Sequence, residues 1–247
     1  MKQLILNVPH SAINIPLKNG YIISDDLIDS EILQLTDWHT EDLFHSDNDI
    51  MVIADFSRII CDTERFADDS QEVMAQFGMG VLYEKTDTGK VMRIISPELR
   101  ERILNEYYWK HHESLSQAVK NQLSLFSQAI IIDCHSFPDI TLQRSLYKEP
   151  YRPDFNIGTD PFHTPKKLID LSIEFFEEKG YSLGIDFPFS GSIVPLEYYQ
   201  KQKGVQSIML EINRKLYLKE GSSEKSDGYD EIKKVTNDFI EAVRSCL

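Results

Sequence analysis

Short apolar runs alternate with longer amphipathic stretches along the chain. The run at residues 129–134 is almost continuously apolar, as expected for a strand that is buried on both faces of a sheet. Further apolar, β-rich runs predict strands at residues 4–8, 50–54, 181–185 and 205–212. These runs are too short to be helices of ordinary length, so the pattern indicates a sheet of several strands.

Helices are predicted between these strands. Ser96, Pro97 and Glu98 combine a capping serine, a first-turn proline and an acid, so a helix should begin there and run to about residue 124. A second helix is predicted from Thr164-Pro165 to Gly180. Two more are expected at residues 25–45, with an interruption near Thr36, and at residues 229–246.

Two stretches show no regular pattern. Residues 66–95 contain several glycines and predict loops with a short hairpin, and the polar, proline-containing stretch after residue 134 is assigned no element until residue 161. The remaining order alternates strand and helix. It predicts an α/β fold with a mostly parallel or mixed central sheet and helices on both faces, in a single domain over residues 1–247.

Composition narrows the class of partner. The chain has 247 residues, of which 41% are hydrophobic and 27% charged, as in an ordinary globular protein. The formal net charge of -14 argues against nucleic acid and anionic membrane surfaces, which need a basic face. An acidic small substrate stays compatible with this charge, because a few arginines in a cleft reverse the local potential. The sequence does not indicate an oligomeric state.

The cysteines and the N-terminus bear on the compartment. Cys61, Cys134 and Cys246 are odd in number and far apart, which argues against a disulfide framework. No signal peptide is recognised, and no apolar run approaches the roughly 20 residues that span a bilayer. A cytoplasmic protein is therefore expected.

Chemically active side chains follow the predicted strands. His10 follows the first strand, Arg58 and Arg65 follow the second, His135 follows the third, and Glu211 lies in the last. Open α/β sheets bind ligands at the carboxyl ends of their strands, so these side chains are expected at one edge of the sheet.

Two histidines and a carboxylate can form a zinc site with an open fourth position. His10 and His135 supply the histidines, and the third ligand is expected from Asp37 or Glu41, which are four residues apart and would share one face of a helix. We expect one Zn²⁺ per chain, although iron and manganese also accept such ligands. Glu211 is the candidate general base that takes a proton from water and passes it to the leaving amine.

Structural roles compete with these assignments. A histidine after a strand is often structural, but two of them, each followed by serine, favour a functional site. Arg58 and Arg65 could instead hold their loop by pairing with nearby carboxylates, namely Asp55, Asp62 or Glu64. A carboxylate in an apolar strand, such as Glu211, would be costly to bury without a partner. His111 and His112 are interpreted as packing residues of a long helix.

Five motifs, in order, resemble those of the N-formylglutamate amidohydrolase family, over about residues 5–217. They are Asn7-Val8-Pro9-His10-Ser11, Thr36-Asp37-Trp38-His39, Ser57-Arg58 with Asp62 and Arg65, Asp133-Cys134-His135-Ser136, and Pro153-Asp154-Phe155-Asn156-Ile157-Gly158-Thr159. Each motif alone is weak, but five in order make the resemblance fairly specific.

The resemblance implies a fold like that of zinc carboxypeptidases and aspartoacylases, which is phosphorylase/hydrolase-like. It implies hydrolysis of N-formyl-L-glutamate to formate and glutamate, late in histidine degradation. Asp37 is favoured over Glu41 as ligand, because it fits the family's Thr-Asp-Trp-His pattern. The same resemblance implies that the substrate is contacted by Arg58, Arg65, Asn156 and Ser136. It implies that Glu211 and Arg58 are the catalytic residues.

The sequence also departs from the family and its relatives. The carboxypeptidase His-x-x-Glu pair is absent, because Ile13 stands three residues after His10, and the segments 78–93 and 211–217 differ from the usual family text. The acyl group and the amino acid therefore stay open. Two alternatives are a zinc carboxypeptidase that cleaves peptides and a non-catalytic protein that binds an acidic metabolite. Metal analysis and a substrate panel would distinguish them.

Overall fold

A six-stranded sheet forms the centre of the molecule, here a computed structural model whose described residues are 2–245. The strands lie in the order β2-β1-β3-β6-β4-β5, and each neighbouring pair is parallel except β4 and β6, which are antiparallel. The strands are β1 (Ile5–Val8), β2 (Ile50–Ile53), β3 (Ala129–Phe137), β4 (Phe155–Gly158), β5 (Leu183–Ile185) and β6 (Val205–Asn213).

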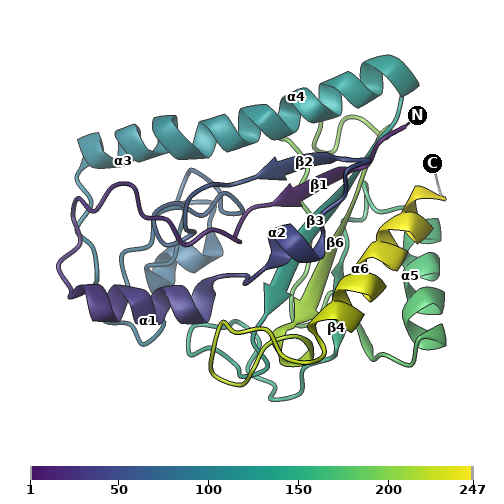
Figure 1. Cartoon of the computed structure of the whole chain (residues 1–247). Coiled ribbons are helices and arrows are strands. Elements are labelled where there is room, and N and C mark those ends of the chain that lie inside the picture. The colour runs from purple at the N-terminus through teal and green to yellow at the C-terminus, as the bar shows by residue number, and fades with distance from the viewer. Residues whose placement is uncertain (1, 246–247) are drawn as a thin grey trace.

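Helices connect the strands and cover the sheet (Figure 1). They are α1 (Asp25–Leu35), α2 (Thr40–Leu43), α3 (Pro97–Ile103), α4 (Trp109–Phe126), α5 (Lys166–Glu178) and α6 (Tyr229–Arg244). The predicted start at Ser96 is confirmed, since its side chain accepts a hydrogen bond from the backbone N–H of Leu99 at 3.2 Å. A π-helical turn (Leu104–Tyr108) joins α3 to α4, so one long helix runs along the sheet.

The two faces of the sheet are covered by different helices. On one face, Ile131 of β3 packs in a cluster with Leu115 and Val119 of α4. On the other, Phe155 stacks on Phe176 of α5, whose ring lies 5.2 Å from that of Phe239 in α6. Figure 1 shows α4 on one side of the strands and α5 and α6 on the other. The predicted α/β fold with a central sheet between helices is confirmed.

The structure corrects two details of the expected elements and confirms a third. A strand, β4, lies in the stretch to which no element had been assigned, and it pairs antiparallel with β6 and parallel with β5. The helix expected at residues 25–45 is interrupted as predicted: the chain turns after Thr36, and His39 adopts the left-handed conformation with φ 63°. β3 extends to Phe137, so His135 lies within the strand and not after it.

Two of the three cysteines, Cys61 and Cys134, are buried and free, and Cys246 lies outside the described residues. None of the helices within residues 2–245 is both long enough and apolar enough to cross a membrane.

Candidate active site

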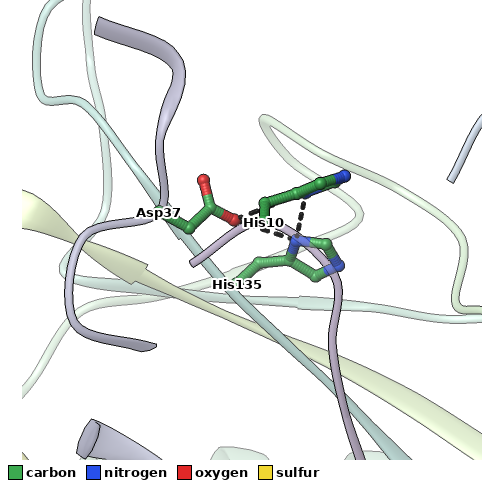
Figure 2. Close-up of side chains that lie close together, drawn as sticks. All are labelled: His10, Asp37 and His135. Atoms are coloured by element: carbon green, nitrogen blue, oxygen red, sulfur yellow. Dashed lines mark hydrogen bonds and ion pairs between the residues drawn. The ribbon is translucent and has the colours of Figure 1, made fainter. Parts of the chain in front are cut away.

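His10, Asp37 and His135 point toward one another at the carboxyl ends of β1 and β3 (Figure 2). The Nδ1 atoms of the two imidazoles are 3.3 Å apart, and Asp37 Oδ2 lies 3.1 Å from His135 Nδ1 and 3.6 Å from His10 Nδ1. All three side chains are buried. Residues distant in the sequence thus bring two imidazole nitrogens and a carboxylate oxygen to one point.

The turn between α1 and α2 places Asp37. Its backbone N–H donates to the carbonyl of His10 at 3.0 Å, which ties this turn to the end of β1. Arg214 donates to Asp37 Oδ1 at 3.0 Å, so the other oxygen, Oδ2, is the one that faces the histidines. Burial would raise the pKa of Asp37, but hydrogen bonds from His10 and His135 hold it well below its ordinary value.

Glu41 does not join this group. Asp37 lies in the turn before α2, whereas Glu41 lies in the helix and is exposed. The expectation that the two carboxylates share one face of a helix is therefore wrong, because the left-handed turn at His39 separates them.

Each of the two imidazoles has a carboxylate beside its second nitrogen. His10 Nε2 is hydrogen-bonded to Asp62 Oδ1 at 2.9 Å, and His135 Nε2 lies 3.1 Å from Asp133 Oδ1. Burial would lower the pKa of His135, but Asp133 and Asp37 raise it well above its ordinary value. Carboxylates in this position orient metal-binding histidines and make them more basic.

The group fits a divalent cation on its own chemistry. With the Nε2 proton of each imidazole directed at its own carboxylate, the two Nδ1 atoms and Asp37 Oδ2 present three lone pairs to one point, where a cation fits. A His₂-carboxylate set is the donor set of catalytic zinc sites, and it leaves a fourth position for water or substrate.

Glu211 lies beside this group. It is paired in register with His135 across β3 and β6, and both side chains are buried. Glu211 Oε2 has no hydrogen-bond partner. Burial raises the pKa of Glu211 to about 8, although the neighbouring His135 opposes the shift. A carboxyl with a pKa in this range is well matched to proton transfer near neutral pH.

A cavity of about 530 Å³ opens over these residues. Arg58 and Arg65 line it, and both also contact Asp62. The Nη2 and Nε atoms of Arg58 donate to Asp62 Oδ2 at 2.9 and 3.3 Å, whereas Arg65 Nε lies 3.7 Å away and is without a hydrogen-bond partner. The two arginines therefore lie at the cavity and also belong to an ion-pair cluster, and Arg65 is the less tightly held.

Ser136 and Asn156 lie differently with respect to the cavity. Ser136 lines it, and its hydroxyl accepts from Arg214 Nε at 3.2 Å. Asn156 is fully buried and is not among the lining residues: its Nδ2 donates to the carbonyl of Phe189 at 2.9 Å, and its Oδ1 accepts from the N–H of Phe187 at 3.1 Å. Asn156 thus holds a loop that lines the cavity, and does not itself reach into the cavity.

Several residues of the site carried no assigned role in the sequence. Asp133 stood in a motif without a function, and Asp62 was considered only as a partner that could hold the loop of Arg58 and Arg65, a pairing that the structure shows. Tyr83, whose hydroxyl donates to Asp62 Oδ2 at 2.6 Å, lies in the irregular stretch where periodicity gives no signal. His111, interpreted as a packing residue, donates to Asn7, which in turn donates to Asp133 Oδ1 at 2.9 Å. The contact of His111 with Asn7 depends on how α4 packs on β1, which the sequence pattern does not indicate.

The fold and the site define a mixed α/β protein with a candidate metal centre at the strand ends. The family model of N-formylglutamate amidohydrolase matches residues 2–218, and the chain belongs to this family. The match confirms the resemblance seen in the motifs and supports a hydrolase that acts on an amide bond.

Two solved structures have the same fold. The N-formylglutamate amidohydrolase from Ralstonia eutropha JMP134 superposes with a TM-score of 0.83 at 23% sequence identity, over 99% of this chain and 95% of that chain. A gene product from Agrobacterium tumefaciens superposes with a TM-score of 0.69 at 16% identity, over 99% of this chain and 91% of that one. No curated protein matches the sequence.

Proposed function

We propose that this protein hydrolyses the amide bond of N-formyl-L-glutamate, or of a close acidic N-acyl amino acid, and depends on a bound divalent metal ion. The observation that carries the proposal is the meeting of His10, Asp37 and His135 beside Glu211, in a chain of this family. The reaction would release a carboxylic acid, formate in the first case, and the free amino acid.

His10 Nδ1, His135 Nδ1 and Asp37 Oδ2 would hold the metal, with one ion per chain. Zn²⁺ is the favoured ion for hydrolysis, and iron and manganese accept the same donors. When bound, such an ion polarises a carbonyl and lowers the pKa of a water molecule. Asp62 and Asp133 would fix the two imidazoles so that their Nδ1 lone pairs face the ion.

Glu211 would move the proton. As the water oxygen bonds to the acyl carbon, Glu211 takes a proton from the water. The bond between carbon and nitrogen then breaks, and Glu211 returns the proton to the nitrogen. The free Oε2 of Glu211, next to the candidate metal group and in the cavity wall, supports this role.

Arg58 and Arg65 would bind the carboxylates of the amino acid. A guanidinium forms paired, charge-assisted hydrogen bonds with a carboxylate, and it offsets the overall negative charge of the chain near the cavity. Ser136 would contact the same substrate. Asn156 would act through the loop that it holds. With N-formyl-L-glutamate as substrate, the reaction would belong late in histidine degradation. The free cysteines Cys61 and Cys134 are consistent with the cytoplasm that we propose as its location.

The test is turnover by purified protein loaded with Zn²⁺. We expect one equivalent of metal per chain and release of formate and glutamate from N-formyl-L-glutamate. Faster cleavage of C-terminal residues from a peptide panel would indicate a carboxypeptidase instead. No bound metal and no turnover of either kind would indicate a non-catalytic binding protein.

A further inference from the structure

The site residues form a row across the sheet, on the face that α4 covers. Arg58 and Arg65 follow β2, His10 follows β1, His135 lies in β3 and Glu211 in β6. Arg58 and Arg65 therefore come from the β2 side of the candidate metal group, with Arg58 Nη1 3.6 Å from Asp37 Oδ1, and Glu211 lies on the opposite side.

A loop occupies the other end of the row, over β4. A Cβ added to Gly158 would lie only 2.1 Å from the carbonyl oxygen of Gly191, so the loop passes very close to β4. Asn156 of β4, which is paired with Glu211, also forms hydrogen bonds with the backbone of Phe187 and Phe189. The loop therefore forms the cavity wall beyond Glu211, on the side away from the arginines.

Apolar side chains gather at this end of the cavity. They are Phe137, Pro188, Phe189, Val194, Leu196 and Met209, and the polar residues Ser190, Ser192 and Tyr199 line the cavity beside them. Leu196 remains 54% exposed. An apolar surface that faces a ligand cavity is available to bind an apolar part of the ligand.

Three polar side chains nearby, those of Ser207, Asp160 and Arg152, are already bonded within the protein. Ser207 donates to the carbonyl of Ile193 at 2.7 Å and also pairs with Ser192. Asp160 accepts from two backbone N–H groups, and Arg152 donates to three backbone carbonyls of the segment 147–151. On the other side, Arg65 lines the cavity, and its buried Nε makes no hydrogen bond within the protein.

A formyl group does not use this space. With a substrate carboxylate at the arginines and the scissile carbonyl near His10 and His135, the acyl group points toward Glu211 and the loop beyond it. N-formylglutamate has only about a dozen non-hydrogen atoms, whereas a cavity of about 530 Å³ is of the size that holds ligands of drug-like dimensions. The single carbon of formyl would leave the apolar end without contacts.

We propose that the preferred substrate carries an apolar acyl group larger than formyl, bound at the end of the cavity formed by Phe137, Phe189, Val194, Leu196 and Met209. This inference rests on the proposed function and changes only the acyl half: the same bond between acyl carbon and nitrogen is hydrolysed, and the acid released is a larger carboxylic acid than formate.

The first experiment compares acyl groups on a constant amino acid. Holoenzyme loaded with Zn²⁺ is assayed with the N-formyl, N-acetyl, N-butanoyl, N-hexanoyl and N-benzoyl derivatives of L-glutamate. We expect kcat/KM to rise along the aliphatic series by about fourfold per buried methylene, which corresponds to ~0.8 kcal/mol, with formyl the poorest substrate. A second series, N-formyl derivatives of glutamate, leucine and phenylalanine, tests the orientation, and glutamate should be preferred.

The second experiment uses matched leucine variants. Leu196→Ser removes an exposed apolar side chain of the cavity, and Leu125→Ser removes one of α4 that is 70% exposed and lies outside the cavity lining. We expect Leu196→Ser to lower the preference for hexanoyl over formyl by on the order of tenfold, and Leu125→Ser to leave it unchanged. Phe189→Ser provides a second variant and should act in the same direction as Leu196→Ser.

The outcomes separate this inference from the function on which it rests. Turnover of N-formylglutamate without faster turnover of the longer acyl derivatives overturns the inference and leaves the proposed function standing. Preference for N-formylleucine or N-formylphenylalanine over N-formylglutamate overturns the orientation on which it depends. If Leu196→Ser and Leu125→Ser change the preference for hexanoyl over formyl equally, Leu196 does not bind the acyl group and the assigned pocket is wrong. Failure to cleave any N-acylglutamate overturns both proposals.

Discussion

His10 Nε2 and Asp62 Oδ1 lie 2.9 Å apart, and the second oxygen of the same carboxylate accepts hydrogen bonds from Arg58 and Tyr83. One buried aspartate thus connects a candidate metal ligand with a candidate substrate-binding arginine. Burial would raise the pKa of Asp62, but Arg58 and His10 hold it well below its ordinary value, so the carboxylate stays charged. The positions of the imidazole and of the guanidinium therefore depend on each other.

Asp62→Asn should weaken metal binding. The amide has the same shape but lacks the charge that orients the imidazole, and loss of such a partner typically costs about 10–100-fold in metal affinity. Titration with a chelator competitor measures the dissociation constant directly. Asp55→Asn is the matched control, because Asp55 is exposed in the same loop. Equal metal affinity in both variants would contradict the role of Asp62.

Asp37→Asn should abolish stoichiometric metal binding, whereas Glu41→Gln should not change it. Asp37 Oδ2 faces both imidazoles, and Glu41 is exposed in α2. The metal content of the purified variants at neutral pH decides between the two carboxylates. His135→Ala completes the series, and stoichiometric zinc in that variant would disprove the ligand set.

Glu211→Gln should retain the metal and lose turnover by about 10²–10⁴-fold, the usual effect of removing general acid–base catalysis. The glutamine fills the same space in β6 but cannot take a proton from water. Metal content and kcat are measured on the same preparation. Turnover close to that of the unaltered protein would rule out Glu211 as the base.

Arg65→Lys and Arg58→Lys should differ. Arg65 lines the cavity and is held only by ion pairs of 3.7 and 3.8 Å. Its replacement should raise KM for an acidic substrate by about tenfold to a hundredfold more than for the neutral amide analogue, given about 1.5–3 kcal/mol for a charge-assisted hydrogen bond. Arg58 also donates two hydrogen bonds to Asp62, so Arg58→Lys should in addition lower Tm. Identical losses with both substrates in Arg65→Lys would leave that arginine with a structural role only.

The pH dependence of stability should report the contact between Asp49 and Arg244. Arg244, at the end of α6, donates to both oxygens of Asp49, which also accepts from the N–H of Leu4. Burial would raise the pKa of Asp49, but the hydrogen bonds from Arg244 and Ser46 and the backbone N–H lower it overall. A carboxyl whose pKa is depressed by folding stabilises the protein above its unfolded pKa of about 3.9, and this contribution is lost as the pH falls through its folded pKa.

Asp49→Asn should therefore lower the free energy of unfolding by about 1.5–3 kcal/mol at pH 7. The difference from the unaltered protein should shrink below about pH 4. Urea unfolding at several pH values measures both quantities, and Asp47→Asn, a change at an exposed position two residues away, is the control. A destabilisation that does not change with pH would show that the ion pair does not contribute.

The sequence predicted those parts of the molecule that depend on local pattern. Apolar runs located five of the strands, and the rule that ligands lie at strand ends brought His10, His135 and Glu211 together. β4 was missed because it is four residues long in a polar stretch, and its antiparallel pairing with β6 depends on tertiary contacts. Local pattern cannot show such a pairing.

The rest of the site depends on the course of loops. The left-handed residue at His39 decides that Asp37, and not Glu41, faces the imidazoles, and an assumed continuous helix leads to the wrong geometry. Tyr83 and Arg214 reach the cluster from segments without periodicity, so no sequence pattern indicates that Tyr83 bonds Asp62 or that Arg214 bonds Asp37.

The Gly191 loop and Met209 approach Gly158 so closely that the side chain at position 158 affects the width of the cavity. A Cβ at this residue would stand 2.1 Å from the Gly191 carbonyl and 2.4 Å from the methyl carbon of Met209, so a single added methyl group must displace the loop or the side chain. Both of these line the cavity. Residue 158 is thus a point at which substrate range can change during evolution while His10, His135 and Glu211 keep their identities.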